Sequence, residues 1–251
     1  MKKFLKIVLA IVVIVPLLML GWLTYSTQKN LAIPGEDALA ALESNEAVDI
    51  ETGDWIVMRP TSATPLAGLI VYPGANCDIR GYAPVLREIA AQGFLVVAVS
   101  MPFDFSIFNP NAADDVRTAF PEIETWVIAG HSMGGAMAGT YAYNHQDDLA
   151  GLIFWDSYPP DYNSFAESDL PIMHIHRAGP DGSVPQMFLD KKFLFPADSK
   201  WVGVPGGMHM YFGSFIGGGY VEQQEPGISQ SAQIEIVTNS TLEAMRSMTS
   251  R

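Results

Sequence analysis

The chain has 251 residues and a formal net charge of −13; 49% of its residues are hydrophobic and only 16% are charged. This composition fits one larger domain with a well-buried core and excludes a long disordered tail. The acidic balance excludes nucleic acid as a partner, because that needs clustered Lys and Arg, and the single Cys77 excludes an internal disulfide and a cysteine-based zinc site.

The N-terminal segment, residues 1–30, is strongly apolar and contains no acidic residue; between residues 4 and 23 only Lys6 is charged. About 20 residues at 1.5 Å each span roughly 30 Å, the thickness of a bilayer core. We predict an uncleaved signal anchor that crosses the membrane through residues 4–23. The alternative is a cleaved signal and a secreted protein, although "TYS" is only a weak cleavage site. Lys2, Lys3 and Lys6 predict an extracytoplasmic domain over residues 31–251 on the cell membrane.

Strand-like and helix-like runs alternate through the remainder of the chain. Strands are expected at residues 54–60, 67–73, 94–102, 126–131, 151–156, 171–177 and 200–204. Helical patterns cover residues 82–93, 111–120, 133–145 and 229–245. Four of the strands are nearly continuous in Val, Ile, Leu and Phe, which is typical of strands covered on both faces. The alternation predicts the α/β class, with a mostly parallel central sheet flanked by helices.

The stretch "GHSMG", residues 130–134, joins an expected strand to an expected helix. A sharp strand-to-helix turn strains its central residue and leaves no room for side chains on either side, so glycine is needed there. Such a turn exposes the Ser132 hydroxyl at a helix N-terminus, where the Met133 N–H points at an oxyanion. We predict Ser132 as a nucleophile; a tight connection without chemistry is the alternative.

A serine nucleophile needs a base, and His209 is the best candidate. It lies in "VPGGMHMYFG", a glycine-rich loop after the last expected strand, from which it can swing over the serine. The other four histidines are expected to be packing or surface residues; these are His131, His145, His174 and His176.

The base needs a carboxylate to orient it and to support its charged form. We predict Asp181, in "HRAGPDGSVP", because it follows an expected strand and lies between the serine and the histidine in chain order. Asp156, which ends "GLIFWD", is the rival, because it also closes a strand on the same sheet edge. Asp181 has the alternative of a turn residue, since P-D-G is also a turn signature. A second oxyanion donor is expected in "IVYPGANCD", from the backbone N–H of Ala75 or Asn76.

The motifs "YPGANCD", "GHSMGG", "RAGPDG" and "GGMHMYFG", in this order, resemble the α/β-hydrolase superfamily over about residues 54–248. The chain is similar to a compact, lid-poor, esterase-like bacterial branch of that superfamily. This resemblance implies a Ser132–His209–Asp181 triad, with oxyanion donors at Met133 and near Ala75. Pro73 is a departure, because many esterases carry histidine before the glycine of this loop.

The expected function is a serine hydrolase, carboxylesterase- or lipase-like, that cleaves small-molecule carboxylic esters through an acyl-enzyme. No cofactor and no metal is required for this chemistry. Two alternatives stay open: an acyltransferase that uses the same triad, and a non-catalytic binding protein of the same fold. Aromatic and methionine residues near the motifs suggest an apolar acyl or alcohol group, with core packing as the alternative; these are Phe103, Phe105, Phe108, Tyr158, Met208, Tyr211 and Phe212.

Overall fold

An eight-stranded sheet forms the centre of the computed structural model, which describes residues 2–65, 67–222 and 224–250. The strand order is β2-β3-β5-β4-β6-β7-β8-β9. The bounds are β2 (Val48–Thr52), β3 (Trp55–Pro60), β4 (Gly68–Tyr72), β5 (Leu95–Val99), β6 (Trp126–His131), β7 (Gly151–Trp155), β8 (Ile172–Ala178) and β9 (Lys200–Pro205). From β5 to β9 all pairs are parallel, whereas β2 and β3 pair antiparallel. The predicted α/β class is confirmed.

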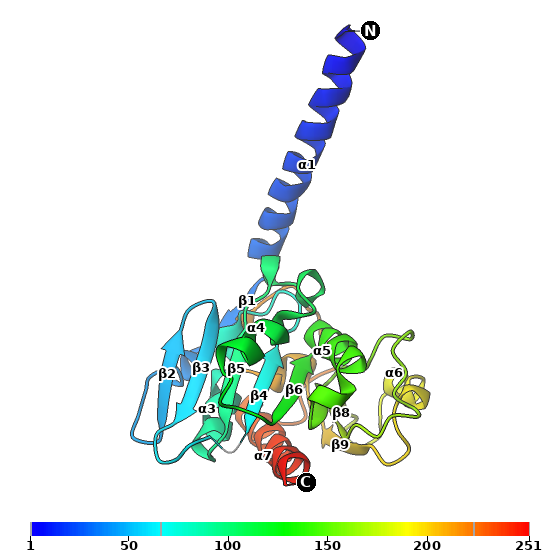
Figure 1. The fold of residues 1–251 in the computed structure, drawn as a ribbon. Coiled ribbons are helices and arrows are strands. Elements are labelled where there is room, and N and C mark those ends of the chain that lie inside the picture. The colour runs from blue at the N-terminus through cyan, green and yellow to red at the C-terminus, as the bar shows by residue number, and fades with distance from the viewer. Residues whose placement is uncertain (1, 66, 223, 251) are drawn as a thin grey trace.

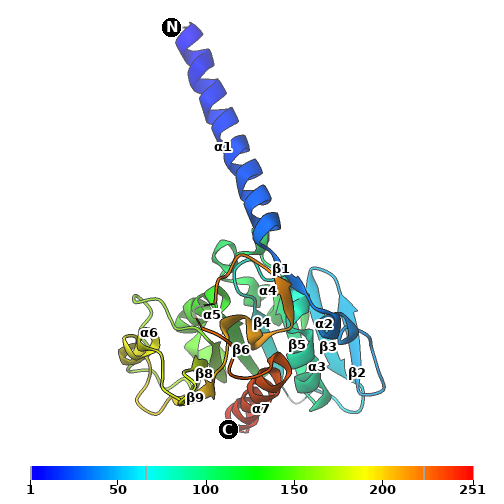
Figure 2. The same cartoon turned by 180° about the vertical axis from the view of Figure 1, so that it is seen from behind.

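Helices cover both faces of this sheet (Figures 1 and 2). One face packs against α3 (Ala83–Ala91) and α7 (Gln230–Thr249), and the other against α4 (Ala112–Ala119) and α5 (Met133–Asn144). In β4, Leu69 and Val71 point into the first core and Ile70 into the second. Because both faces are buried, the central strands need apolar residues at every position.

The seven predicted strands are all present, with differences only at their ends. Three strands were not predicted: β2, at the sheet edge, and the two-stranded ribbon of β1 (Ala32–Pro34) and β10 (Phe215–Gly217). In β2, Asp49, Glu51 and Thr52 are exposed, so this strand has no continuous apolar run. β1 and β10 are too short to show a period. The short helix α2 (Glu36–Ala40) follows β1.

Helix α1 (Lys2–Asn30) projects away from the sheet domain (Figure 1). Its segment Leu9–Asn30 has a mean hydropathy of 2.1, and its most apolar stretch is not covered by the rest of the chain, whereas Thr27 near its end is buried. By length and composition this segment fits a membrane span or a signal sequence. Met1 and the side chains of Lys2, Lys3 and Lys6, on which the predicted orientation depends, lie outside what the structure describes.

The ribbon of β1 and β10 joins α1 to the domain. The Ala32 N–H donates to the Asn76 carbonyl at 2.8 Å, and the Gly219 N–H donates to the Asn30 carbonyl at 3.0 Å. The end of α1 is thus bonded to the loop after β4 and to the segment after β10. These bonds place three distant parts of the chain side by side at one end of the molecule.

Strand β8 carries two buried histidines side by side, His174 and His176, which agrees with the expected packing role. Among the described residues, neither ring nitrogen of His174 has a hydrogen-bond partner. Burial, and then the neighbouring His176, lower the pKa of His174 to about 3 from an ordinary 6.5. Below pH 6.5 the unfolded chain therefore binds a proton that the folded chain excludes.

We expect the free energy of unfolding to fall as the pH decreases from 6.5 towards 3, by up to about 1.4 kcal/mol per pH unit for each such histidine. His174→Phe should reduce this slope, because the ring then stays uncharged among Phe188, Phe195 and Trp201. Urea unfolding of the full chain in detergent at pH 7.5 and 5 measures the change. Equal pH slopes for the wild type and the variant would contradict it.

Candidate active site

Ser132 lies in the turn between β6 and α5, with φ 53° and ψ −123°. This left-handed conformation is strained for any residue other than glycine and is typical of functional turns. A Cβ on Gly134 would overlap the carbonyl oxygens of Tyr72 and Pro73, and one on Gly130 would overlap the backbone of Gly134. The glycine spacing that the sequence displays is therefore a steric requirement of this turn.

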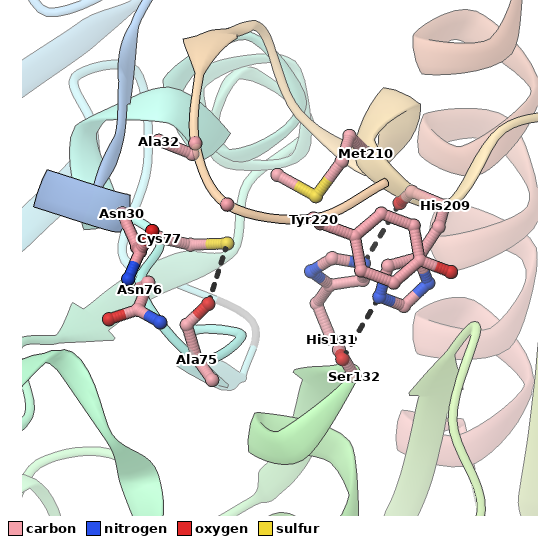
Figure 3. Close-up of a pocket in the computed structure, with 12 residues that line it drawn as sticks. Asn30, Ala32, Ala75, Asn76, Cys77, His131, Ser132, His209, Met210 and Tyr220 are labelled. Atoms are coloured by element: carbon pink, nitrogen blue, oxygen red, sulfur yellow. Dashed lines mark hydrogen bonds between the residues drawn. The ribbon is translucent and has the colours of Figure 1, made fainter. Parts of the chain in front are cut away.

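The structure brings His209 to Ser132. The imidazole Nε2 of His209 lies 3.0 Å from the Ser132 Oγ, and the ring is buried (Figure 3). The loop that carries it is fixed by Gln233 of α7, which accepts from the Met208 N–H at 2.8 Å and donates to the Met208 carbonyl at 2.8 Å. Gln233 was not identified from the sequence, because its contact with the loop spans 25 residues.

The carboxylate that contacts His209 is Asp156. Its Oδ2 lies 2.6 Å from the His209 Nδ1. Because an ionised carboxylate only accepts hydrogen bonds, Nδ1 carries the ring proton and Nε2 is left to accept the Ser132 hydroxyl. Burial alone would raise the pKa of Asp156, but the hydrogen bond and charge of His209 and the charge of Arg177 outweigh it and lower the pKa to about 2. Asp156 is therefore ionised at any pH near neutrality.

Asp181 does not reach His209, so its predicted contact is wrong. It is exposed, and its Oδ1 accepts the Ser183 N–H at 3.0 Å within a tight turn. The turn is closed by a hydrogen bond from the Gly179 N–H to the Ser183 carbonyl at 2.8 Å. Gly182 within it has a φ of 81°. The P-D-G stretch thus forms a turn.

The position of Asp156 follows from the sheet order. β7 lies beside β6, and their last residues, Trp155 and His131, pair with each other. Ser132 and Asp156 directly follow these two residues, so they lie at the same edge of the sheet. Asp156 also has a positive φ, 48°, which turns it over the sheet edge. The order of the strands, which no local pattern in the sequence shows, is what places Asp156 beside Ser132.

Arg177, near the end of β8, is a further charged group in the site and was not identified from the sequence. Its Nη1 forms an ion pair with Asp156 Oδ2 and lies 3.2 Å from the His209 Nδ1. Its backbone N–H also donates to Asp156 Oδ1 at 2.8 Å. Arginine fixes the carboxylate but places a positive charge beside the imidazole.

Arg177→Gln should therefore move the acid limb of the kcat/KM profile to higher pH, because Arg177 is one of the charges that lower the pKa of Asp156, and without it the carboxylate is protonated more readily. Arg177→Lys, which keeps the charge, serves as the matched control. The pH profile of ester hydrolysis from pH 4 to 9 measures the shift. An acid limb that is unmoved in Arg177→Gln, or moved equally in both variants, would contradict this role.

The loop after β4 carries the two backbone N–H groups that were expected as the second oxyanion donor, those of Ala75 and Asn76. The Gly74 N–H donates to the Tyr82 hydroxyl at 3.0 Å, and the Asn76 N–H donates to the Asp104 carbonyl at 2.9 Å. Within the described residues, the Ala75 N–H between them has no hydrogen-bond acceptor. Ala75 and Ser132 line the same cavity, so of the two expected donors Ala75 is the one left available.

His131 and Tyr82 connect this loop to His209. The Tyr82 hydroxyl lies 2.8 Å from the His131 Nδ1, and the His131 Nε2 lies 3.0 Å from the His209 carbonyl. A carbonyl only accepts, so Nε2 donates and Nδ1 accepts from Tyr82. Burial, and then the nearby His209, lower the pKa of His131 well below its ordinary value, so it stays neutral. His131, which was expected only to pack, thus also links the loop after β4 to the segment that carries His209.

A cavity of about 230 Å³ opens onto Ser132 and His209 (Figure 3). Tyr220 covers one side of it, with its ring centroid 4.3 Å from that of His209. The described part of the chain contains no cluster of His, Cys, Asp and Glu that could hold a metal ion. Of the aromatic and methionine residues considered in the sequence, Met208 and Phe212 belong to the core, whereas Phe103 and Phe108 are exposed.

Solved structures of other proteins share this fold. Est1E from Butyrivibrio proteoclasticus is 14% identical, with 82% of this chain and 100% of that chain covered and a TM-score of 0.57. A soluble variant of monoglyceride lipase from Saccharomyces cerevisiae, in complex with a substrate analog, is 13% identical (82% and 97% covered, TM-score 0.56). Ferulic acid esterase from Streptomyces cinnamoneus is 19% identical (73% and 67% covered, TM-score 0.54). At such identities the likeness shows the fold alone.

No match was found among the curated proteins. The model of one sequence family does match, over residues 68–235, a range that includes Ser132, Asp156 and His209. That range extends from the first residue of β4 into α7 and so covers most of the sheet domain. The chain therefore belongs to the alpha/beta hydrolase family.

Proposed function

We propose that this protein is a serine hydrolase that cleaves carboxylic esters with a Ser132–His209–Asp156 triad. The observation that carries the proposal is the continuous chain of contacts from the Ser132 Oγ to the His209 Nε2, at 3.0 Å, and from the His209 Nδ1 to the Asp156 Oδ2, at 2.6 Å. Both distances are hydrogen-bond distances, and the imidazole is in the tautomer that a general base needs.

In the first half-reaction, Ser132 attacks the acyl carbonyl while His209 takes the proton from its hydroxyl. His209 then gives this proton to the leaving alcohol, and the acyl group stays on Ser132 as an ester. In the second half-reaction, His209 takes a proton from water, the resulting hydroxide releases the acid, and the proton returns to Ser132. Asp156 orients the ring and balances its charge throughout.

The oxyanion of each tetrahedral intermediate is bound by two backbone N–H groups. Met133 is the first residue of α5, where the helix N-terminus has no internal acceptor for its N–H. The Ala75 N–H is the second donor, and it is positioned by the bonds of Gly74 and Asn76 on either side. Pro73, the departure from many esterases, directly precedes Gly74 in this loop.

Ester cleavage is also in keeping with the proteins of similar fold, which are named as esterases and a monoglyceride lipase.

The proposal further includes residues 1–30 as a retained signal anchor and residues 31–251 as an extracytoplasmic domain. Two features of the sequence support retention: the apolar run of about 20 residues is long enough to cross a bilayer core, and "TYS" is only a weak cleavage site.

The test is hydrolysis of p-nitrophenyl esters of increasing chain length by the full chain in detergent, with products identified in the presence and absence of an added alcohol. We expect free acid as the main product in both cases. A transferred ester as the main product would assign an acyltransferase instead. No turnover together with no labelling by a fluorophosphonate would assign a non-catalytic protein.

A further inference from the structure

The wall of the catalytic cavity includes the end of helix α1. Asn30, the last residue of α1, lines the cavity together with Ala75, Ser132 and His209 (Figure 3). The bonds from Ala32 to Asn76 and from Gly219 to Asn30 fix this arrangement. Any bilayer around α1 therefore lies on the side of the domain where the cavity is.

The length of α1 sets the distance between the cavity and such a bilayer. If residues 4–23 cross the hydrocarbon core, residues 24–30 extend about 10 Å beyond it at 1.5 Å per residue. The headgroup layer on each side is about 5–8 Å thick, because the whole bilayer is about 40–45 Å thick and its core about 30 Å. Asn30 and the cavity beside it thus lie at the outer edge of the headgroups.

Exposed apolar side chains gather around the same end of the domain. The 3-10 turn Pro102–Asp104 contacts α1, and the next turn, Ser106–Phe108, follows directly. On another side of the α1 base, the segment bonded to Asn30 leads from Gly219 into two further exposed residues. We call this set the collar; it comprises Phe103, Ile107, Phe108, Tyr220 and Val221, which are between 40% and 81% exposed.

The loops that carry the collar lie beside the base of α1 in both views (Figures 1 and 2). Single exposed apolar residues are normal on a protein surface, but a cluster of them marks an interaction site. Aromatic and aliphatic side chains at the end of a membrane helix are typical of the bilayer interface. The collar is therefore suited to rest on the lipid that surrounds α1.

The cavity itself limits the chemistry of the substrate. None of the described residues that line it is Lys, Arg, Asp or Glu, so it offers no cation for a phosphate or carboxylate. Its volume of about 230 Å³ is below the roughly 300–1,000 Å³ of a site that encloses a whole drug-sized ligand. It can take an uncharged ester and a short part of a chain, while the remainder of a long substrate stays outside.

Resting on the proposed ester hydrolysis, we infer that the enzyme takes its substrate from the membrane surface. The substrate class is an uncharged acyl ester amphiphile whose ester lies at the headgroup level. The collar rests on the bilayer, the ester enters the cavity beside Asn30, and the rest of the acyl chain stays in the lipid. The fatty acid and the neutral alcohol are the products.

The experiment uses the full chain in vesicles of an ether-linked phosphatidylcholine, which has no acyl ester to cleave. A long-chain monoacylglycerol is the neutral probe, a long-chain phosphatidylglycerol is the anionic probe, and p-nitrophenyl butyrate is the water-soluble ester.

The collar variant is Ile107→Glu with Val221→Glu. The control is Phe193→Glu, since Phe193 is 66% exposed in the segment that follows α6 (Gln186–Leu189), away from α1 (Figure 1). Rates are divided by the fraction of enzyme that a fluorophosphonate labels, which corrects for misfolding.

We expect the monoacylglycerol to be cleaved at least about tenfold faster than the phosphatidylglycerol. The collar variant should lower the ratio of monoacylglycerol to p-nitrophenyl butyrate turnover at least about tenfold, and Phe193→Glu should change it less than about twofold. An unchanged ratio in the collar variant, faster cleavage of the anionic lipid, or cleavage of the soluble ester alone would each overturn the inference and leave the hydrolase standing. Failure to cleave any ester would overturn the proposed function as well.

Discussion

Ser132→Ala should lower kcat for ester hydrolysis about 10⁶-fold, to the residual rate that binding and the oxyanion donors supply. The alanine has no hydroxyl for His209 to deprotonate, so no acyl-enzyme can form. Steady-state hydrolysis of a p-nitrophenyl ester by the full chain in detergent measures the loss, with circular dichroism to check the fold.

His209→Ala should cost about as much as Ser132→Ala, because nucleophile and base act as a unit. Ser183→Ala is the matched control: it lies in the turn with Asp181 and contacts none of the three triad residues among the described contacts. A Ser132→Ala protein that keeps more than about 1% of the wild-type rate would place the nucleophile elsewhere.

Asp156→Asn should lower kcat about 10⁴-fold while the fold persists. The asparagine keeps the shape but cannot hold the proton on the His209 Nδ1, so the imidazole turns its protonated nitrogen towards Ser132. Because the pKa of Asp156 is about 2, the carboxylate stays ionised above pH 4. The wild-type carboxylate therefore does not titrate between pH 5 and 9, and the loss should be present throughout this range.

Asp181→Asn is the matched control for this measurement, since the substitution is identical and the residue lies in an exposed turn. We expect its kcat within about twofold of the wild type. The reverse result, with a large loss in Asp181→Asn and a small one in Asp156→Asn, would mean that the loop after β8 rearranges to bring Asp181 to the base.

The sequence was most informative where the structure depends on local steric requirements. The glycines on either side of Ser132 are needed by one turn, and the turn needs only the strand before it and the helix after it. The buried strands were equally clear, because a strand covered on both faces must be apolar at each position. His209 could be chosen since its glycine-rich loop follows the last strand.

The acid could not be chosen in this way, because the choice depends on which strands are neighbours. Asp156 and Asp181 both follow a strand, and both lie between Ser132 and His209 in the chain. Only the pairing of β7 with β6 places Asp156 beside Ser132. The same holds for Tyr82 and Arg177, whose partners lie 49 and 21 residues away. Such contacts follow from the order of the sheet rather than from any local pattern.

The strands β1, β2 and β10 could not be predicted from the sequence for a different reason. β2 is half exposed and polar, and β1 and β10 contain three residues each. β1 and β10 are fixed by backbone pairing with each other across about 180 residues of chain, which leaves no mark on side-chain periodicity. They nevertheless matter for function, because β1 and β10 bring the end of α1 to the cavity.

The most direct test of the triad is covalent labelling of the full chain with a fluorophosphonate, followed by mass spectrometry of the labelled peptide. We predict one adduct, on Ser132, with a labelling rate that falls steeply in His209→Ala and Asp156→Asn but not in Asp181→Asn. A folded wild-type protein that is not labelled, or that is labelled at another residue, would contradict the assignment of Ser132, His209 and Asp156 as one catalytic unit.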